Sequence, residues 1–249
     1  MNLIGHFACA AALPAAGQLG SVMPDLVTIY DRSLRTPRLL HRLGQMANHE
    51  PAAPVVAAGV SFHLTVDRHF HRNTLFTDGY RGIRDSLRQA SDTPGLRRML
   101  PAHVLHELFL DHLLLADDPA MAERFYAVVD EHQALIVDSA GLPDQAAAQG
   151  LRDFLQRVAH DRFVDDYGDL DGLFYRMNRI LARYRQRPLE AAETAAVTDF
   201  LEAARPAFAE RQRHFVAAMQ QPLAASGGPW NGTRQSREHP AARPDERLG

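Results

Sequence analysis

The stretch VVAAGVSFHLTVDRHFHRNTLF, residues 55–76, is the part of the chain from which the fold is best predicted. Its apolar residues Val56, Val60, Leu64 and Phe70 recur at the spacing of a helix with one apolar face. The pattern therefore predicts an amphipathic helix that packs this face against a core.

Side chains that bind metals lie within the same stretch. His63, Asp67 and His71 follow one another at intervals of four residues, and a helix of about 3.6 residues per turn places such positions on one slowly drifting face. Imidazole nitrogen and carboxylate oxygen on successive turns form half of a site for a divalent ion. The alternative is a surface hydrogen bond or a weak ion pair.

A second cluster of polar residues lies in LPAHVLHELFLDHLLL, residues 100–115. Its broad apolar stripe predicts a largely buried helix, on which His103, Glu107 and Asp111 fall at successive turns. Charged groups on a buried helix are costly unless they are paired or bound to a metal. This cluster could therefore supply the partners that His63 and Asp67 require.

Composition excludes several classes of enzyme. The chain has 249 residues with a net charge of −3, which gives no general attraction to nucleic acid or to an anionic membrane. All 27 basic residues are Arg, so a P-loop, a pyridoxal Schiff base and a Ser–Lys dyad are excluded. The single cysteine, Cys9, excludes a disulfide within the chain and a zinc site built on cysteines. Chemistry must then come from His, Asp, Glu, Arg and a bound ion.

The remaining sequence is helical in pattern, with no alternation typical of strands. We predict an all-α, single-domain helical bundle over residues 1–221 and a disordered tail over residues 222–249, which are rich in Pro, Gly and Arg. Further helices are expected at 80–89, 120–137, 151–161, 170–187 and 191–221, the last kinked or divided at Pro206.

The first thirty residues contain two features with alternative interpretations. MNLIGHFACAAALPAAGQ is similar to a signal peptide but lacks a positively charged start, so we expect a cytoplasmic protein with no membrane association. A turn is predicted over residues 14–20, and Pro24 followed by Asp25 is typical of a helix start. Asp25 is then either a capping residue or part of a functional site.

Several segments together resemble the acyl carrier protein phosphodiesterases. These segments are MNLIGH at 1–6, GSVMPDL at 20–26, AGV at 58–60, the His63 and Asp67 pair, and RFVDDYGDLDGLFYRMNRILARYRQRP at 162–188, followed by the helix around 208–219. The resemblance implies an all-α fold related to the HD-type metal phosphohydrolases. It also implies hydrolysis of the phosphodiester that joins 4′-phosphopantetheine to a serine of acyl carrier protein, within fatty acid and lipid metabolism, with a divalent ion such as manganese.

The resemblance also assigns residues to the site. The early histidine of the family corresponds to His6, the aspartate after the glycine to Asp25, the helical pair to His63 and Asp67, and two positions on the later helix to His103 and Glu107. We therefore expect these six residues to converge as metal ligands or their supports, with Asp25, His63, Asp67 and Glu107 in catalytic roles.

The sequence departs from the family pattern at three positions. Ala8 replaces a second early histidine, Leu64 replaces an arginine, and Leu108 replaces the histidine of a later Asp-His pair. His103, His106 or Asp111 could compensate for the lost ligands. Two alternatives follow: a hydrolase of another phosphoester, such as a nucleotide, or a non-catalytic helical binding module with a decayed site.

Overall fold

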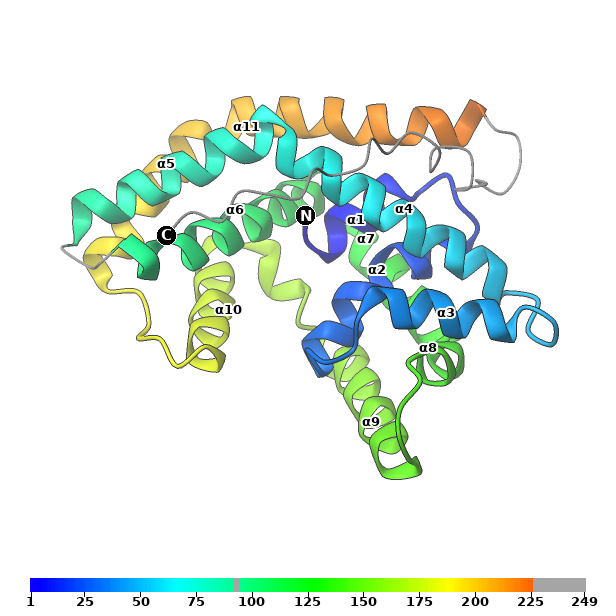
Figure 1. Ribbon diagram of the computed structural model, residues 1–249. Coiled ribbons are helices and arrows are strands. Elements are labelled where there is room, and N and C mark those ends of the chain that lie inside the picture. The colour runs from blue at the N-terminus through cyan, green and yellow to red at the C-terminus, as the bar shows by residue number, and fades with distance from the viewer. Residues whose placement is uncertain (92–94, 226–249) are drawn as a thin grey trace, which may run out of the picture.

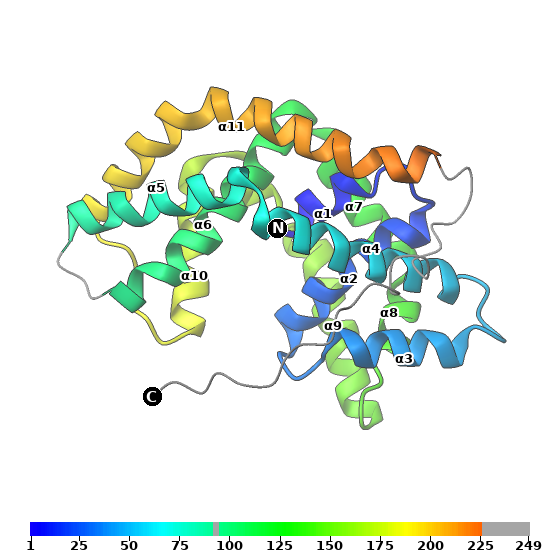
Figure 2. The ribbon, with the colours of Figure 1, turned by 45° about the horizontal axis from the view of Figure 1, so that its top comes forward.

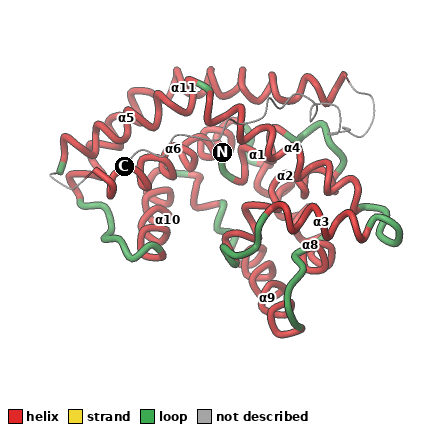
Figure 3. Tube along the Cα trace, viewed as in Figure 1, coloured by secondary structure: helices red, strands yellow, loops and turns green. Residues whose placement is uncertain are grey.

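The computed structural model describes residues 1–91 and 95–225, and it confirms an all-α, single-domain bundle. These residues form eleven α-helices and one short 3-10 helix, with no strand among them (Figures 1 and 3). The elements are α1 (Leu3–Cys9), α2 (Ala15–Tyr30), α3 (Thr36–Met46), α4 (Ala53–Arg72), α5 (Thr74–Ala90), α6 (Gly95–Asp117), α7 (Ala120–Glu131), α8 (Gln133–Ser139), α9 (Gln145–Asp161), η1 (Asp165–Gly168), α10 (Leu170–Arg183) and α11 (Ala191–Ala225).

The short first helix lies at the centre of the molecule. Every residue of α1 is buried, and the helix contacts α2, α4, α6, α7 and α11. Figures 1 and 2 show α11 extending along one side above it, with α4 and α5 alongside. A helix of seven residues has little stability of its own, so tertiary contacts hold α1 in place.

Helices α2 and α4 pack closely because each has a glycine at their crossing. A Cβ atom at Gly20 would lie 2.2 Å from the carbonyl oxygen of Val56, and one at Gly59 would lie 2.1 Å from that of Gly17. The Cα atoms of Gly20 and Gly59 therefore approach each other without side chains between them. This contact sets the distance between Asp25 on α2 and His63 on α4.

The start of α2 differs from the sequence prediction. Residues 15–20, expected in a turn, are helical, and Pro24 and Asp25 lie inside α2 rather than at its start. Glycine and proline are weak helix formers, but the contact with α4 outweighs their propensities. Asp25 is consequently not a capping residue.

The long stretch around residues 55–76 also differs in detail. Val56, Val60 and Phe70 are buried as predicted, whereas Leu64 is 39% exposed and Val66 takes the core position. The helix α4 ends at Arg72, and the side chain of Asn73 accepts a hydrogen bond from the amide of Leu75 to begin α5.

Other predicted helices keep their type but change their bounds. The helix expected at 120–137 is divided at His132 into α7 and α8, and the helix expected at 170–187 ends at Arg183, shortly before Arg185 adopts a φ of 56°. The helix expected from 151 begins at Gln145, where Asp144 caps it. Helix α11 is continuous through Pro206 and extends to Ala225, four residues past its expected end at 221. The remainder of the predicted tail, 226–249, is outside the described residues.

Within the described ranges, none of the helices has both the length and the apolar character that crossing a membrane requires.

Candidate metal centre

Four helices bring imidazole and carboxylate side chains together beside the start of the chain. The contributing residues are His6 from α1, Asp25 from α2, His63, Asp67 and His71 from α4, and His103 and Glu107 from α6. All six residues proposed from the sequence are in this cluster. Six of the seven side chains form two groups of three, and Asp67 lies between the groups.

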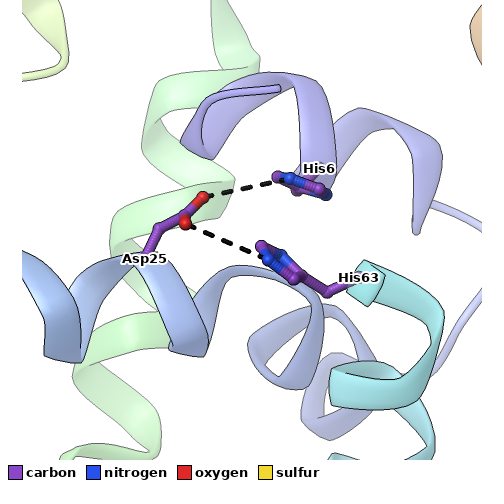
Figure 4. A group of neighbouring side chains, drawn as sticks. All are labelled: His6, Asp25 and His63. Carbon is purple, nitrogen blue, oxygen red and sulfur yellow. Dashed lines mark ion pairs between the residues drawn. The ribbon is translucent and has the colours of Figure 1, made fainter. Parts of the chain in front are cut away.

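The first group consists of His6, Asp25 and His63 (Figure 4). Oδ2 of Asp25 lies 3.9 Å from Nε2 of His6, and Oδ1 lies 4.0 Å from Nε2 of His63. The two imidazole rings are stacked, with their centroids 3.9 Å apart. A nitrogen and oxygen set of this kind suits the borderline ion Zn²⁺ and also the harder Mn²⁺.

The ring orientation in this group leaves ligand atoms available. Nδ1 of His63 lies 2.9 Å from the carbonyl oxygen of Ser21 and donates to it, so the lone pair of Nε2 is directed at Asp25. Neither ring nitrogen of His6, nor Oδ2 of Asp25, has a hydrogen-bond partner within the described part of the chain, although all three atoms are buried. Buried polar atoms normally find a partner, so these atoms are suited to holding an ion.

Burial also shifts the protonation of this group. The pKa of His6 lies well below its usual value, mainly because the ring is buried, and the neighbouring His63 lowers this pKa further. The imidazole is therefore neutral, which is the form that binds metals. Burial raises the pKa of Asp25 to about 6, against the opposing effect of His63.

The second group consists of His71, His103 and Glu107. Oε1 of Glu107 lies 3.1 Å from Nε2 of His103 and 3.6 Å from Nε2 of His71, and the two nitrogens are 3.4 Å apart. This group is more open than the first, because the side chains of His71 and His103 are 32% and 40% exposed.

Asp67 lies between the two groups together with the amino group of Met1. Oδ1 of Asp67 is 3.9 Å from Nε2 of His6 in the first group and 3.3 Å from Nδ1 of His71 in the second. The ammonium nitrogen lies 3.1 Å from this oxygen and 2.8 Å from Oε1 of Glu107. A cation thus already occupies the position where the carboxylates of the two groups approach each other.

These contacts set the charges on the residues between the groups. Burial alone would raise the pKa of Asp67, but the hydrogen bond from His71 and the ammonium group lower it to about 2. The same bond, together with that to Glu107, raises the pKa of His71 to about 10. The ammonium group and both histidines hold the pKa of Glu107 well below its usual value, although burial opposes them.

Two residues considered as substitute ligands do not reach the centre. Nε2 of His106 donates to the carbonyl oxygen of Leu75 at 2.9 Å. Asp111 accepts hydrogen bonds from the amides of Ile4 and Gly5, at 3.2 and 2.8 Å. Since these are first-turn amides of α1, Asp111 caps the helix that carries His6 and has a structural role.

The assignment of ligands from the sequence omitted His71. Its signal was present, because it continues the four-residue spacing of His63 and Asp67. The family resemblance gave it no counterpart, and only the approach of α6 shows that His71 faces His103.

The three departures from the family pattern lie in different environments. Ala8 and Leu108 are buried in the core, at 4% and 1% exposure, while Leu64 is exposed next to His63. Comparisons of the chain with models of known protein families, with curated protein sequences and with solved structures found no match.

Proposed function

We propose that this chain is a metal-dependent phosphodiester hydrolase that releases 4′-phosphopantetheine from holo-acyl carrier protein, on a scaffold related to the HD-type phosphohydrolases. The observation that carries the proposal is the convergence of His6, Asp25 and His63 from three separate helices, where both ring nitrogens of His6 and Oδ2 of Asp25 are buried with no hydrogen-bond partner in the described part of the chain. Its substrate is taken from the resemblance of the sequence to the acyl carrier protein phosphodiesterases.

The donor set favours a divalent ion, with Mn²⁺ as the first candidate. His6, Asp25 and His63 would hold it, and Asp67 lies within reach of the same position. When bound, such an ion lowers the pKa of a coordinated water and offsets negative charge on phosphoryl oxygens.

The residues of the chain can then assist hydrolysis. Asp25, whose carboxylate oxygens face Nε2 of His6 and Nε2 of His63 at 3.9 and 4.0 Å, can accept the proton that the attacking water loses. The water oxygen forms a bond to phosphorus as the phosphorus–oxygen bond to serine breaks, and the serine oxygen takes up a proton from solvent. The side chains of Asp25, Asp67 and His103 are 32–40% exposed, so a phosphodiester can reach these residues from the solvent.

Mass spectrometry tests this function directly. We expect the purified protein with Mn²⁺ to convert holo-acyl carrier protein to the apo form, with the loss of the phosphopantetheine mass. Asp25→Asn should reduce the rate by at least about 100-fold, since it removes both a ligand and a proton acceptor. His69→Gln, an exposed position on the same helix, is the control and should retain activity. An unchanged carrier protein mass with the metal-loaded wild type contradicts the proposal.

A second candidate is hydrolysis of another phosphoester, such as a nucleotide. The observation that favours it is Leu64, since an apolar side chain is exposed where the family has an arginine that could contact an acidic carrier protein. A panel of nucleotides and small phosphodiesters, assayed for phosphate or alcohol release with Mn²⁺, separates the two candidates. The absence of bound metal together with no turnover of any of these substrates favours a non-catalytic binding module with a decayed site.

A further inference from the structure

The second group has the geometry of a metal site in its own right. The three distances between Nε2 of His71, Nε2 of His103 and Oε1 of Glu107 are 3.1, 3.4 and 3.6 Å. Ligands of a tetrahedral ion with bonds of about 2.1 Å are separated by about 3.4 Å. The three atoms therefore already form one face of a coordination tetrahedron, more regular than the first group, where the contacts are 3.9 and 4.0 Å.

The side chains are held in this arrangement by contacts outside the group. Nδ1 of His71 donates to the carbonyl oxygen of Asp67 at 2.9 Å, so Nε2 is the nitrogen that faces His103 and Glu107, and it loses its proton when an ion binds there. The ring of Phe76 contacts both imidazoles edge to face, with centroid distances of 4.6 Å to His71 and 5.0 Å to His103. The same arrangement of a backbone carbonyl behind a ligand histidine occurs at His63.

Positive charge already lies beside the second group. The ammonium nitrogen of Met1 is 2.8 Å from Oε1 of Glu107 and 3.1 Å from Oδ1 of Asp67. Both carboxylates are therefore paired with a cation, and it is the ligand geometry, not the net charge, that favours a second ion. Oδ1 of Asp67 lies 3.9 Å from Nε2 of His6, within reach of the first ion, and 3.3 Å from Nδ1 of His71, the ring nitrogen that does not face the second group.

We infer that His71, His103 and Glu107 bind a second divalent ion, next to the ion proposed for His6, Asp25 and His63, so that the centre holds two ions. The inference rests on the proposed function and extends it to the class of hydrolases that use paired ions. In such sites one ion orients the attacking oxygen while the other offsets charge on the leaving oxygen.

Metal stoichiometry tests the inference. The protein, tagged at its C-terminus, is stripped with a chelator, dialysed against MnCl₂ and analysed for manganese per chain. We expect two ions in the wild type, one in His103→Gln and one in His71→Gln. His69→Gln, on the same helix as His71 but outside both groups, should keep two. Because the His103 side chain is 40% exposed, its variant is expected to fold, which thermal unfolding followed by circular dichroism checks.

Electron paramagnetic resonance supplies an independent readout. Two adjacent Mn²⁺ ions should give an exchange-coupled spectrum in the wild type, and His103→Gln should convert it to the six-line signal of an isolated ion. One ion in both the wild type and His103→Gln, lost only in His63→Gln, overturns the second site and leaves the proposed function intact. Two uncoupled ions overturn the shared centre. A wild type that binds no manganese contradicts the proposed function as well.

Discussion

Glu107 and Asp111 are one helical turn apart on α6, and their surroundings differ in charge. Glu107 faces the ammonium group and two histidines, which hold its pKa well below the usual value despite burial. Asp111 faces only backbone amides, so burial dominates and raises its pKa to about 8. Of these two acidic residues on successive turns, Glu107 therefore belongs to the candidate metal centre, whereas Asp111 supports α1.

Asp111→Ala should destabilise the protein. The substitution leaves the amides of Ile4 and Gly5 buried without acceptors, and each such loss costs about 1–3 kcal/mol. We expect the free energy of unfolding, measured by urea denaturation, to fall by about 2–4 kcal/mol. Asp111→Asn retains one acceptor oxygen and should lose less. Equal stability of Asp111→Ala and the wild type would show that α1 does not depend on this cap.

His112 gives a prediction for the dependence of stability on pH. Arg205 donates to Nε2 of His112 at 2.8 Å, while Nδ1 of the ring donates to the carbonyl of Tyr167 at 2.8 Å, so the imidazole is neutral. Burial, reinforced by Arg205, lowers the pKa of His112 below its usual value. The unfolded chain then binds more protons, and this contribution to stability is lost as the pH falls below about 6.5.

The matched variant for this prediction is His112→Gln. Glutamine can accept from Arg205 and donate to Tyr167 but does not titrate. Lowering the pH from about 7.5 to about 5.5 should destabilise the wild type relative to His112→Gln. Other groups contribute to the slope of both proteins: burial lowers the pKa values of His6 and His106, whereas the raised pKa values of Asp25, Asp111 and His71 act in the opposite direction. Identical slopes for the two proteins would exclude His112 as a source of the pH dependence.

At the scale of elements, the crossing of α2 and α4 controls the site. Gly20 and Gly59 bring the two backbones together, and Asp25 and His63 lie about one turn further along their helices. The crossing explains why proline and glycine are tolerated inside α2, where helix propensity alone predicts a turn.

Alanine substitutions of glycines distinguish this crossing from ordinary helix surface. Gly20→Ala places a Cβ atom 2.2 Å from a backbone oxygen, so the helices must separate, at a cost of about 3 kcal/mol. Gly44 on α3 is exposed with no atom within 4 Å of a built Cβ, so Gly44→Ala should stabilise by about 1 kcal/mol. Thermal unfolding of both variants measures the contrast. A neutral Gly20→Ala would mean that the crossing is looser than the structure indicates.

At the scale of the whole molecule, the candidate centre connects α1, α2, α4 and α6. An ion bound there contacts helices that are distant in sequence, so it favours the folded chain over the unfolded one. At a free Mn²⁺ concentration about 100 times the dissociation constant, we expect about 2.7 kcal/mol of added stability. A chelator should therefore lower the melting temperature of the wild type by more than that of His63→Gln, which retains only the second group. Equal melting temperatures of the wild type with and without Mn²⁺ contradict an ion at this centre.

The sequence by itself determined the class of fold and most of the candidate ligands. Helical spacing of apolar residues repeats in every long segment, and burial of one helix face requires only that other helices cover it. His63, Asp67 and Glu107 could be proposed because spacings of four residues are local and a helix converts them directly into one face. Helix ends were predicted less well, since periodicity reveals neither the side-chain cap at Asn73 nor the backbone conformations of His132 and Arg185.

Tertiary structure alone decided how the ligands are divided and which residues support them. Asp25 has no pattern connecting it to His63, and the two meet because glycines on α2 and α4 permit close approach. His71 is separated from His103 by more than thirty residues, and only the packed helices place the amides of α1 against Asp111 and His71 of α4 against Glu107. Such distances depend on how helices cross and on which backbone groups are left without partners, and both are fixed only when the whole bundle is assembled.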